Sequence, residues 1–255
     1  MDNVADDGEP GENDNARSDL EGFTGSSVAD TLTGGVGNDI INGGGGNDAI
    51  NGAGGDDSIN GGAGNDTLTG GSGGDTINVI AGNGGPDTIA GGAGNDTLDG
   101  GSGNDTVSGN DGADTLAQGT TNDGSDMLSG GDGVDSIDYS LRSASVSVSL
   151  DGLPNDGNSS EQDNVPNDVE TIKGGLGADV LTGNSGNGTI DGGSGNDTID
   201  GGLGADYLIG GAGTDTVTYA SRTQSVVVDL TDAGTDGQTD EGDTVDASVE
   251  NLEGG

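Results

Sequence analysis

The stretch GGVGNDIIN GGGGNDAIN GAGGDDSIN GGAGNDTLT GGSGGDTIN, at residues 34–78, repeats one nine-residue pattern five times. The pattern runs on to residue 138, interrupted by irregular twelve-residue segments at 79–90 and 118–129, and a weaker unit at 25–33 precedes it. A second block of five units occupies residues 174–218. A fixed period of this length is typical of solenoids in which each repeat stacks on its neighbours.

Two positions of the nonapeptide carry the pattern. Position six is Asp in sixteen of the seventeen units, the exception being Gly188. One apolar residue in nine fits neither the helical period nor the two-residue period of an ordinary strand. We therefore expect very short strands separated by glycine turns. Position eight is aliphatic in every unit: Leu32, Ile41, Ile50, Ile59, Leu68, Ile77, Ile89, Leu98, Val107, Leu116, Leu128, Ile137, Leu181, Ile190, Ile199, Leu208 and Val217.

The residue types within a unit suggest how it folds. Glycine at positions one, two and four lets the backbone adopt positive φ and leaves its carbonyl oxygens accessible to a ligand. The last three residues, such as Thr67-Leu68-Thr69, are strand formers whose middle side chain points inward. Two nonapeptides then complete one coil, and successive coils stack as parallel strands with their turns in two ladders. The sequence predicts an all-β parallel β-roll, a solenoid with two nonapeptides per coil.

The charge of the chain indicates what the roll needs in order to fold. Stacking places position-six carboxylates about 4.8 Å apart, where two unit charges repel by roughly 3 to 4 kcal/mol at an effective dielectric constant near 20. The formal net charge is −43, from 47 acidic and four basic residues. We expect folding only when cations lie between the turns. Calcium suits such turns because it takes about six to eight carboxylate and carbonyl oxygens, whereas magnesium prefers a tighter octahedron and keeps its waters.

Composition excludes several other functions. The chain has no His and no Cys, so it lacks the usual nucleophile pairs and the usual zinc, haem and disulfide chemistry. A polyanion is repelled by nucleic acid and by anionic membrane surfaces. No apolar run is long enough to span a membrane, and the acidic stretch from Met1 to Arg17 does not resemble a secretory signal. We expect a protein that is not an enzyme, does not insert into membranes and has a cation as its partner.

A different 35-residue unit, here called the inter-roll unit, occurs at 139–173 and again at 219–253, at a constant offset of 80. All eight Glu and all four basic residues of the chain lie outside the nonapeptide blocks. We expect the inter-roll units to be larger coils that continue or cap the rolls, with strands at 145–150 and 225–230. Corresponding residues include Tyr139 and Tyr219, Arg142 and Arg222, Asp163 and Asp243, and Glu170 and Glu250.

The repeats divide the chain into five segments. A partial inter-roll unit at 1–24 precedes the first roll at 25–138, the inter-roll unit at 139–173, the second roll at 174–218 and an inter-roll unit at 219–255 that ends at the start of a further repeat. Because both ends fall inside a repeat, we expect the chain to be a segment of a longer array or a product truncated from one.

GGAGNDTL and its relatives make the chain resemble the RTX (repeats-in-toxin) family of hemolysin-type calcium-binding nonapeptide repeats. The resemblance implies several calcium ions between adjacent turns, bacterial type I secretion and folding outside the cell. It also implies that position-six Asp and neighbouring glycine carbonyls are the ligands. The implied set is Asp39, Asp48, Asp57, Asp66, Asp75, Asp96, Asp105, Asp114, Asp135, Asp179, Asp197, Asp206 and Asp215, with Gly35, Gly37, Gly44, Gly46, Gly62, Gly64, Gly92, Gly94, Gly101, Gly103, Gly193 and Gly195.

The resemblance pairs these Asp residues between units two apart, and some units depart from the pattern. Gly188 removes a carboxylate, and we expect the irregular segments to weaken sites around Asp87 and Asp126. The implied pairs are Asp39 with Asp57, Asp48 with Asp66, Asp57 with Asp75, Asp96 with Asp114, Asp179 with Asp197, and Asp197 with Asp215.

Two functions of different classes remain open. One is a secreted or cell-surface stalk or scaffold of an adhesin, exoprotein or matrix, with further repeats or cell-surface and matrix components as partners besides calcium. The other is the C-terminal folding and secretion module of a secreted protease or lipase. Ice or mineral binding is disfavoured because position three, with Val36, Gly45 and Ala63, forms no outward Thr array. The G-x-S-x-G stretch at 70–74 cannot build a catalytic triad without His.

Overall fold

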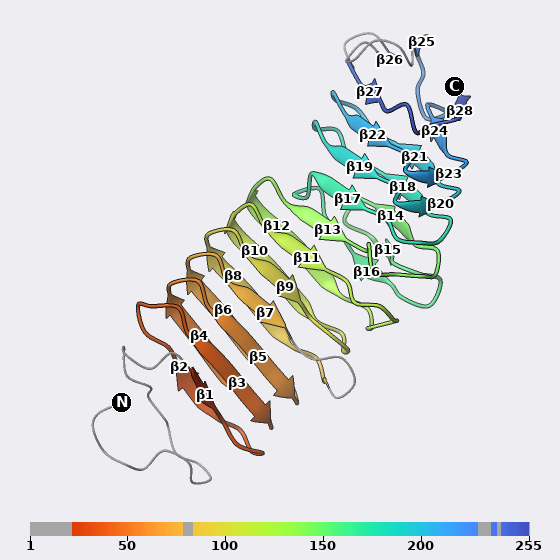
Figure 1. Cartoon of the computed structure of the whole chain (residues 1–255). Helices are drawn as coiled ribbons and strands as arrows, with labels where there is room; N and C mark the ends of the chain where they lie inside the picture. Colours follow the sequence, from red (N-terminus) through yellow and green to blue (C-terminus); the bar gives the residue numbers. More distant parts are fainter. Residues whose placement is uncertain (1–21, 79–83, 229–235, 239–240, 255) are drawn as a thin grey trace. The chain divides into compact units, whose positions relative to one another are not determined.

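The computed structural model describes residues 22–78, 84–228, 236–238 and 241–254. Every regular element in these ranges is a β-strand, as Figure 1 shows. The chain divides into two compact units, Met1–Asp135 and Ser136–Gly255. None of the described residues forms a helix that is long and apolar enough to cross a membrane.

Unit 1 contains two parallel sheets whose strands alternate along the chain. In Figure 1 the successive strands of each sheet lie side by side. One sheet holds β1 (Gly22–Thr24), β3 (Ile40–Gly45), β5 (Ser58–Ala63), β7 (Thr76–Asn78), β9 (Thr97–Asp99) and β11 (Thr115–Ala117). The other holds β2 (Thr31–Thr33), β4 (Ala49–Gly54), β6 (Thr67–Ser72), β8 (Thr88–Ala93), β10 (Thr106–Gly112) and β12 (Met127–Gly133).

The strand register confirms a coil of two nonapeptides. Ile41 lies opposite Ile59, eighteen residues later in the same sheet. Across the first irregular segment Ile77 lies opposite Leu98, so three extra residues are absorbed without displacing the core position. The second irregular segment behaves in the same way, because β10 and β12 pair in parallel with a 21-residue offset.

Unit 2 is built on the same plan. Its first sheet holds β13 (Ser136–Asp138), β17 (Thr171–Lys173), β19 (Thr189–Asp191), β22 (Tyr207–Ile209) and β27 (Thr244–Val245). Its second holds β14 (Ser147–Ser149), β18 (Val180–Thr182), β21 (Thr198–Asp200), β24 (Thr216–Thr218) and β28 (Asn251–Glu253). Three two-stranded pairs accompany them: β15 (Pro154–Asp156) with β16 (Asp163–Asn164), β20 (Ser194–Gly195) with β23 (Ala212–Gly213), and β25 (Val226–Val227) with β26 (Gly237–Gln238).

The inter-roll unit at 139–173 forms one enlarged coil. Its strands β14 and β17 pair in parallel with β18 and β19 of the second roll. The antiparallel pair β15–β16 lies between them in sequence. In the copy at 219–253, β27 and β28 pair with β22 and β24, while residues 229–235 and 239–240 lie outside the described part. The N-terminal partial unit predicted at 1–24 lies outside it up to residue 21.

The core is a line of aliphatic side chains, as the repeat predicted. All seventeen position-eight residues are buried, and none is more than 3% exposed. Several strands are longer than predicted, because β3 to β6, β8, β10 and β12 continue into the glycines that open the next unit. Pairs such as Gly44 with Gly62 extend the ladder there. Parallel pairing with both neighbouring coils therefore imposes strand geometry on glycines that have little intrinsic strand preference.

Candidate metal centres in the turns

The position-six Asp side chains form ladders that link successive coils. The backbone N–H of Asp39 donates to Asp57 Oδ1 at 2.9 Å, and the N–H of Asp57 donates to Asp75 Oδ1 at 2.8 Å. The other four Asp pairs implied by the sequence are joined in the same way at 2.8–2.9 Å. All thirteen predicted Asp ligands are buried. The structure thus brings together every pair that the sequence implied, through a hydrogen bond that sequence reasoning did not foresee.

The second carboxylate oxygen distinguishes the first turns of a roll from the later ones. Asp39 Oδ2 accepts the N–H of Gly35, and Asp179 Oδ2 accepts the N–H of Gly175, both at 2.7 Å. In many of the later turns this oxygen is buried and has no hydrogen-bond partner within the described structure. This holds for the Oδ2 atoms of Asp48, Asp57, Asp66, Asp75, Asp87, Asp96, Asp105, Asp114, Asp197, Asp206 and Asp215.

Burial disfavours the charged form of these carboxylates. Desolvation is the largest cause of the raised pKa values, and the backbone N–H bonds offset it only in part. It raises the pKa of Asp105 and Asp206 to about 7, and the pKa of Asp96 and Asp197 to about 6. Neighbouring Asp residues raise these pKa values further. A nearby cation would favour the charged form of each group.

Glycine carbonyls point from one turn toward the next. A Cβ added to Gly62, at position two, would collide with the carbonyl oxygen of Gly44, and one added to Gly64, at position four, would collide with that of Gly46. The space between turns therefore has room for carbonyl oxygens but not for side chains. Nine of the twelve predicted glycine ligands adopt positive φ: Gly44, Gly46, Gly62, Gly64, Gly92, Gly94, Gly101, Gly193 and Gly195.

Both irregular segments keep their Asp in the ladder. The N–H of Asp66 donates to Asp87 Oδ1 at 2.6 Å, and the N–H of Asp105 donates to Asp126 Oδ1 at 2.9 Å. The predicted ligand set omitted Asp87 and Asp126, although their Asp-x-aliphatic spacing was visible in the sequence. Whether sites there are weaker, as expected, stays a prediction.

Gly188 marks a place where the ladder lacks a carboxylate. Its N–H still donates to Asp206 Oδ1 at 2.7 Å. A Cβ at this position would lie 2.7 Å from the carbonyl oxygen of Glu170. Glycine therefore fits at position 188, because a side chain there would be too close to the carbonyl oxygen of Glu170 in the enlarged coil.

Position five adds a second link that the sequence reasoning missed. The N–H of Asn65 donates to Asn47 Oδ1 at 3.2 Å, and the N–H of Thr214 donates to Asn196 Oδ1 at 3.0 Å. These bonds run from a later coil to an earlier one, opposite to the position-six bonds. Frequent Asn at position five was the available signal. Hydrogen bonds to the side chains at positions five and six therefore link a turn to both neighbouring turns.

The donor set fits a hard divalent cation. Many later turns offer one carboxylate oxygen without a partner in the described structure. A carbonyl oxygen lies near it, because a Cβ added to Gly43 would collide with both Asp48 Oδ2 and the carbonyl oxygen of Gly61. Among the described residues no group of three or more acidic side chains converges as a metal site would. Backbone carbonyls are ligands that calcium accepts readily.

Comparison with known proteins agrees with this chemistry. The sequence profile of the RTX calcium-binding nonapeptide repeat, in four copies, matches residues 24–59, 48–77, 81–116, 120–140, 167–187 and 182–217. These matches cover more than half of the chain. A search of curated proteins finds no match.

Proposed function

Because the chain belongs to the RTX calcium-binding nonapeptide repeat family, it binds several calcium ions on a parallel β-roll, and we propose that calcium is what folds it. RTX repeats are typical of secreted bacterial proteins. In this proposal the chain is a secreted or cell-surface segment, exported by type I secretion, that serves as a stalk or scaffold of a larger exoprotein or adhesin.

The line of buried Oδ2 atoms without a partner carries this proposal. Leaving such a group unpaired is costly, and leaving it charged costs more. Calcium between the turns would supply the missing positive charge and bind these oxygens together with carbonyls of positions two and four. The predicted Asp and Gly set then contains the ligands, extended by Asp87 and Asp126 in the irregular segments.

A structural role is supported by what the chain is made of. Its chemistry-bearing side chains are mostly carboxylates, and a chain without His or Cys offers few groups for acid–base or nucleophilic catalysis. We therefore propose that this segment is not itself catalytic. A folding and secretion module of a hydrolase would use the same turns, and a protease or lipase domain encoded in the same reading frame would favour that alternative.

Replacing Asp57 with Asn tests the ligand assignment. The amide keeps an oxygen that can accept the N–H bond but removes the charge beside the proposed cation. We expect the calcium concentration at the midpoint of folding, followed by far-UV circular dichroism, to rise about tenfold.

Asp132→Asn is the matched control, because Asp132 is exposed and the change removes the same unit of charge. Its midpoint should stay within about twofold of the unmodified chain, as expected for screened surface charge. Equal shifts in the two variants would show that general charge reduction, not loss of a ligand, governs folding.

A further inference from the structure

In the inter-roll units an Asp Oδ2 accepts a hydrogen bond from a tyrosine hydroxyl, unlike the unpaired Asp Oδ2 atoms of the rolls. The N–H of Asp206 donates to Asp243 Oδ1 at 3.0 Å, so Asp243 takes the next place in the ladder. Its Oδ2, the atom that lacks a partner in Asp206, accepts the hydroxyl of Tyr219 at 3.1 Å. In the other inter-roll unit the hydroxyl of Tyr139 donates to Asp163 Oδ2, also at 3.1 Å. Here a protein hydroxyl satisfies the oxygen that we assign to calcium elsewhere.

Each of these tyrosines is accompanied by a buried arginine. The Arg142 guanidinium lies 5.7 Å from the Tyr139 ring centre, and its Nη1 donates to Glu161 Oε1 at 2.7 Å. Both charged side chains are at most 2% exposed. Arginine suits this place because its planar, always-charged head pairs with carboxylates and stacks on aromatic rings. The inter-roll unit therefore carries its own positive charge.

The second copy repeats the arrangement. Arg222 lies 5.4 Å from the Tyr219 ring centre, and its Nε donates to Glu241 Oε1 at 2.6 Å. Its Nη1 also donates to Asp200 Oδ1 at 2.9 Å, at the end of β21 in the roll. The pair of networks is thus a property of the repeated unit and not of one position.

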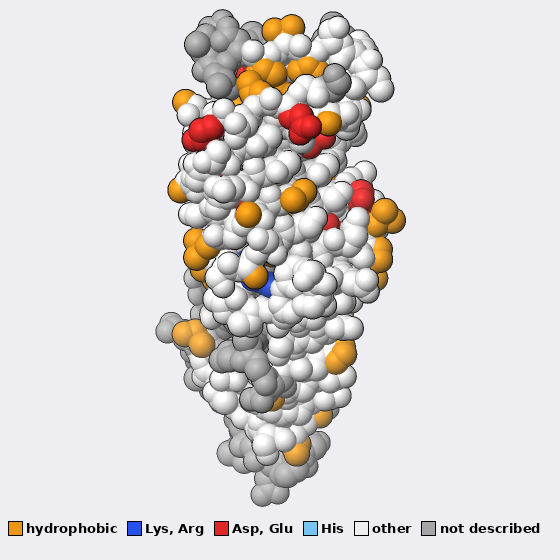
Figure 2. All heavy atoms as spheres, turned by 90° about the vertical axis from the view of Figure 1, so that its right-hand side faces the viewer, with side chains coloured by type: hydrophobic (Ala, Val, Ile, Leu, Met, Phe, Trp, Pro, Cys, Tyr) orange, Lys and Arg blue, Asp and Glu red, His pale blue; other side chains and the backbone are white. Residues whose placement is uncertain are grey.

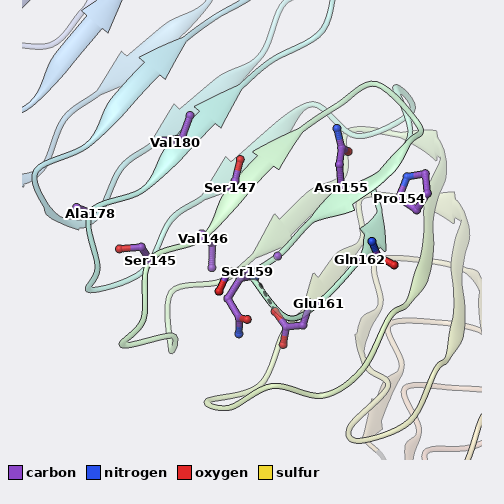
Figure 3. Close-up of a pocket in the computed structure, with 12 residues that line it drawn as sticks. Ser145, Val146, Ser147, Pro154, Asn155, Ser159, Glu161, Gln162, Ala178 and Val180 are labelled. Carbon is purple, nitrogen blue, oxygen red and sulfur yellow. Dashed lines mark hydrogen bonds between the residues drawn. The ribbon is translucent and has the colours of Figure 1, made fainter.

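Two carboxylates of the inter-roll unit converge beside one glycine. A Cβ at Gly157 would lie 2.6 Å from Asp163 Oδ2 and 2.7 Å from Glu161 Oε2. Glu161 Oε2 accepts the N–H of Asn158 at 2.8 Å. Glu161 lines a pocket of about 430 Å³ together with Ser145, Ser147 of β14, Ser159 and Gln162 (Figure 3). Backbone, hydroxyl and guanidinium donors together bind these carboxylates.

The inter-roll unit also has more apolar core per residue than a coil of the roll. An eighteen-residue coil buries two aliphatic side chains, whereas residues 139–173 bury seven large apolar ones: Tyr139, Val146, Val148, Leu150, Val165, Val169 and Ile172. Burial of apolar area is the main favourable contribution to folding. This enlarged coil therefore depends less on neutralising its charges from outside.

We propose that each inter-roll unit is a metal-independent cap, in which Tyr and Arg take the place of calcium and onto which the neighbouring roll folds. The cap presents formed strands, β14 and β17, for pairing with β18 and β19 of the next roll. Calcium-dependent folding of that roll then begins beside the cap. The inference rests on the proposed function, because it requires the rolls themselves to need calcium.

Hydrogen exchange of the full chain, read by mass spectrometry in EDTA and in millimolar calcium, tests the proposal. In EDTA we expect protected amides in 146–150 and 163–173 and fast exchange in the nonapeptide turns. Adding calcium should then protect the rolls. Exchange at unfolded rates throughout 139–173 in EDTA would overturn the proposal. If instead the rolls were protected in EDTA, the proposed function would be wrong. The cap proposal would then be wrong as well, because it requires rolls that need calcium to fold.

Tyr139→Phe and Tyr219→Phe separate the hydroxyl from the ring. Each keeps the packing but leaves one Asp Oδ2 without its donor, so protection of the same inter-roll unit in EDTA should fall about tenfold. Tyr207→Phe is the control, because it also removes a tyrosine hydroxyl. Tyr207 is exposed, and its hydrogen bond to Asp246 Oδ2 is long, at 3.4 Å. Unchanged protection in both test variants would contradict the assigned role of the hydroxyl.

Discussion

Gly64 shows how a single residue is constrained by stacking. Its φ is +141°, and a Cβ there would collide with the carbonyl oxygen of Gly46 in the preceding coil. Gly37 holds the same position in its unit, but a Cβ added to Gly37 meets no atom of the described residues within 4 Å. The need for glycine at position four therefore comes from the neighbouring turn.

This contrast predicts different effects of Gly64→Ala and Gly37→Ala. With calcium at saturation, Gly64→Ala should lower the free energy of unfolding in urea by at least about 2 kcal/mol, through backbone strain and displacement of a carbonyl. Gly37→Ala should change it by no more than about 0.5 kcal/mol. A similar loss in both variants would mean that position four matters only within its own turn.

For single residues, the sequence identifies the core positions and the Asp of the ladder but not the hydrogen bonds that join the coils. Position eight and position six were identified because one residue type recurs at a fixed phase. The partner of Asp57 Oδ1 could not be inferred, since it is a backbone N–H of another coil. Asn at position five was overlooked for the same reason: its bond crosses between coils, and no pattern within one unit shows it.

Among the elements, the Asp ladders carry the pH dependence. The folded pKa is about 7 for Asp105 and Asp206 and about 6 for Asp96 and Asp197, against an ordinary value of 3.8. A folded pKa above the unfolded one means that the folded chain binds protons more tightly. The resulting stability is fully present below about pH 4 and is lost as the pH rises through 6 to 7.

We therefore expect acid to favour folding in EDTA. In EDTA the β signal in far-UV circular dichroism should be larger at pH 5 than at pH 8. With saturating calcium the difference should shrink or reverse, because protons compete with the cation for the same oxygens. A metal-free β signal that grows as the pH rises from 5 to 8 would show that these carboxylates are not desolvated.

The elements themselves were only partly foreseeable. Parallel pairing at an eighteen-residue offset followed from the repeat, and the structure confirms it in both units. Extension of β3 to β6 through glycines was not predicted, because glycine is a weak strand former and the neighbouring coils impose the geometry. The Tyr–Asp and Arg–Glu contacts of the inter-roll units were also missed, although the offset of 80 had aligned most of their residues.

For the whole molecule, the fold hides much of the negative charge. Figure 2 shows only scattered Asp and Glu side chains among the described atoms of one face, although the formal net charge is −43. The ladder carboxylates lie inside the turns instead. Fold class and metal were predictable from composition and period, whereas the way in which buried carboxylates are satisfied required the structure.

Small-angle scattering of the full chain tests the central claim most directly. In EDTA the radius of gyration should lie well toward the roughly 55 Å of an unfolded chain of this length. Millimolar calcium, but not magnesium, should contract it cooperatively. A chain that is as compact after thorough chelation as it is with calcium would contradict the claim that the cation makes the rolls fold.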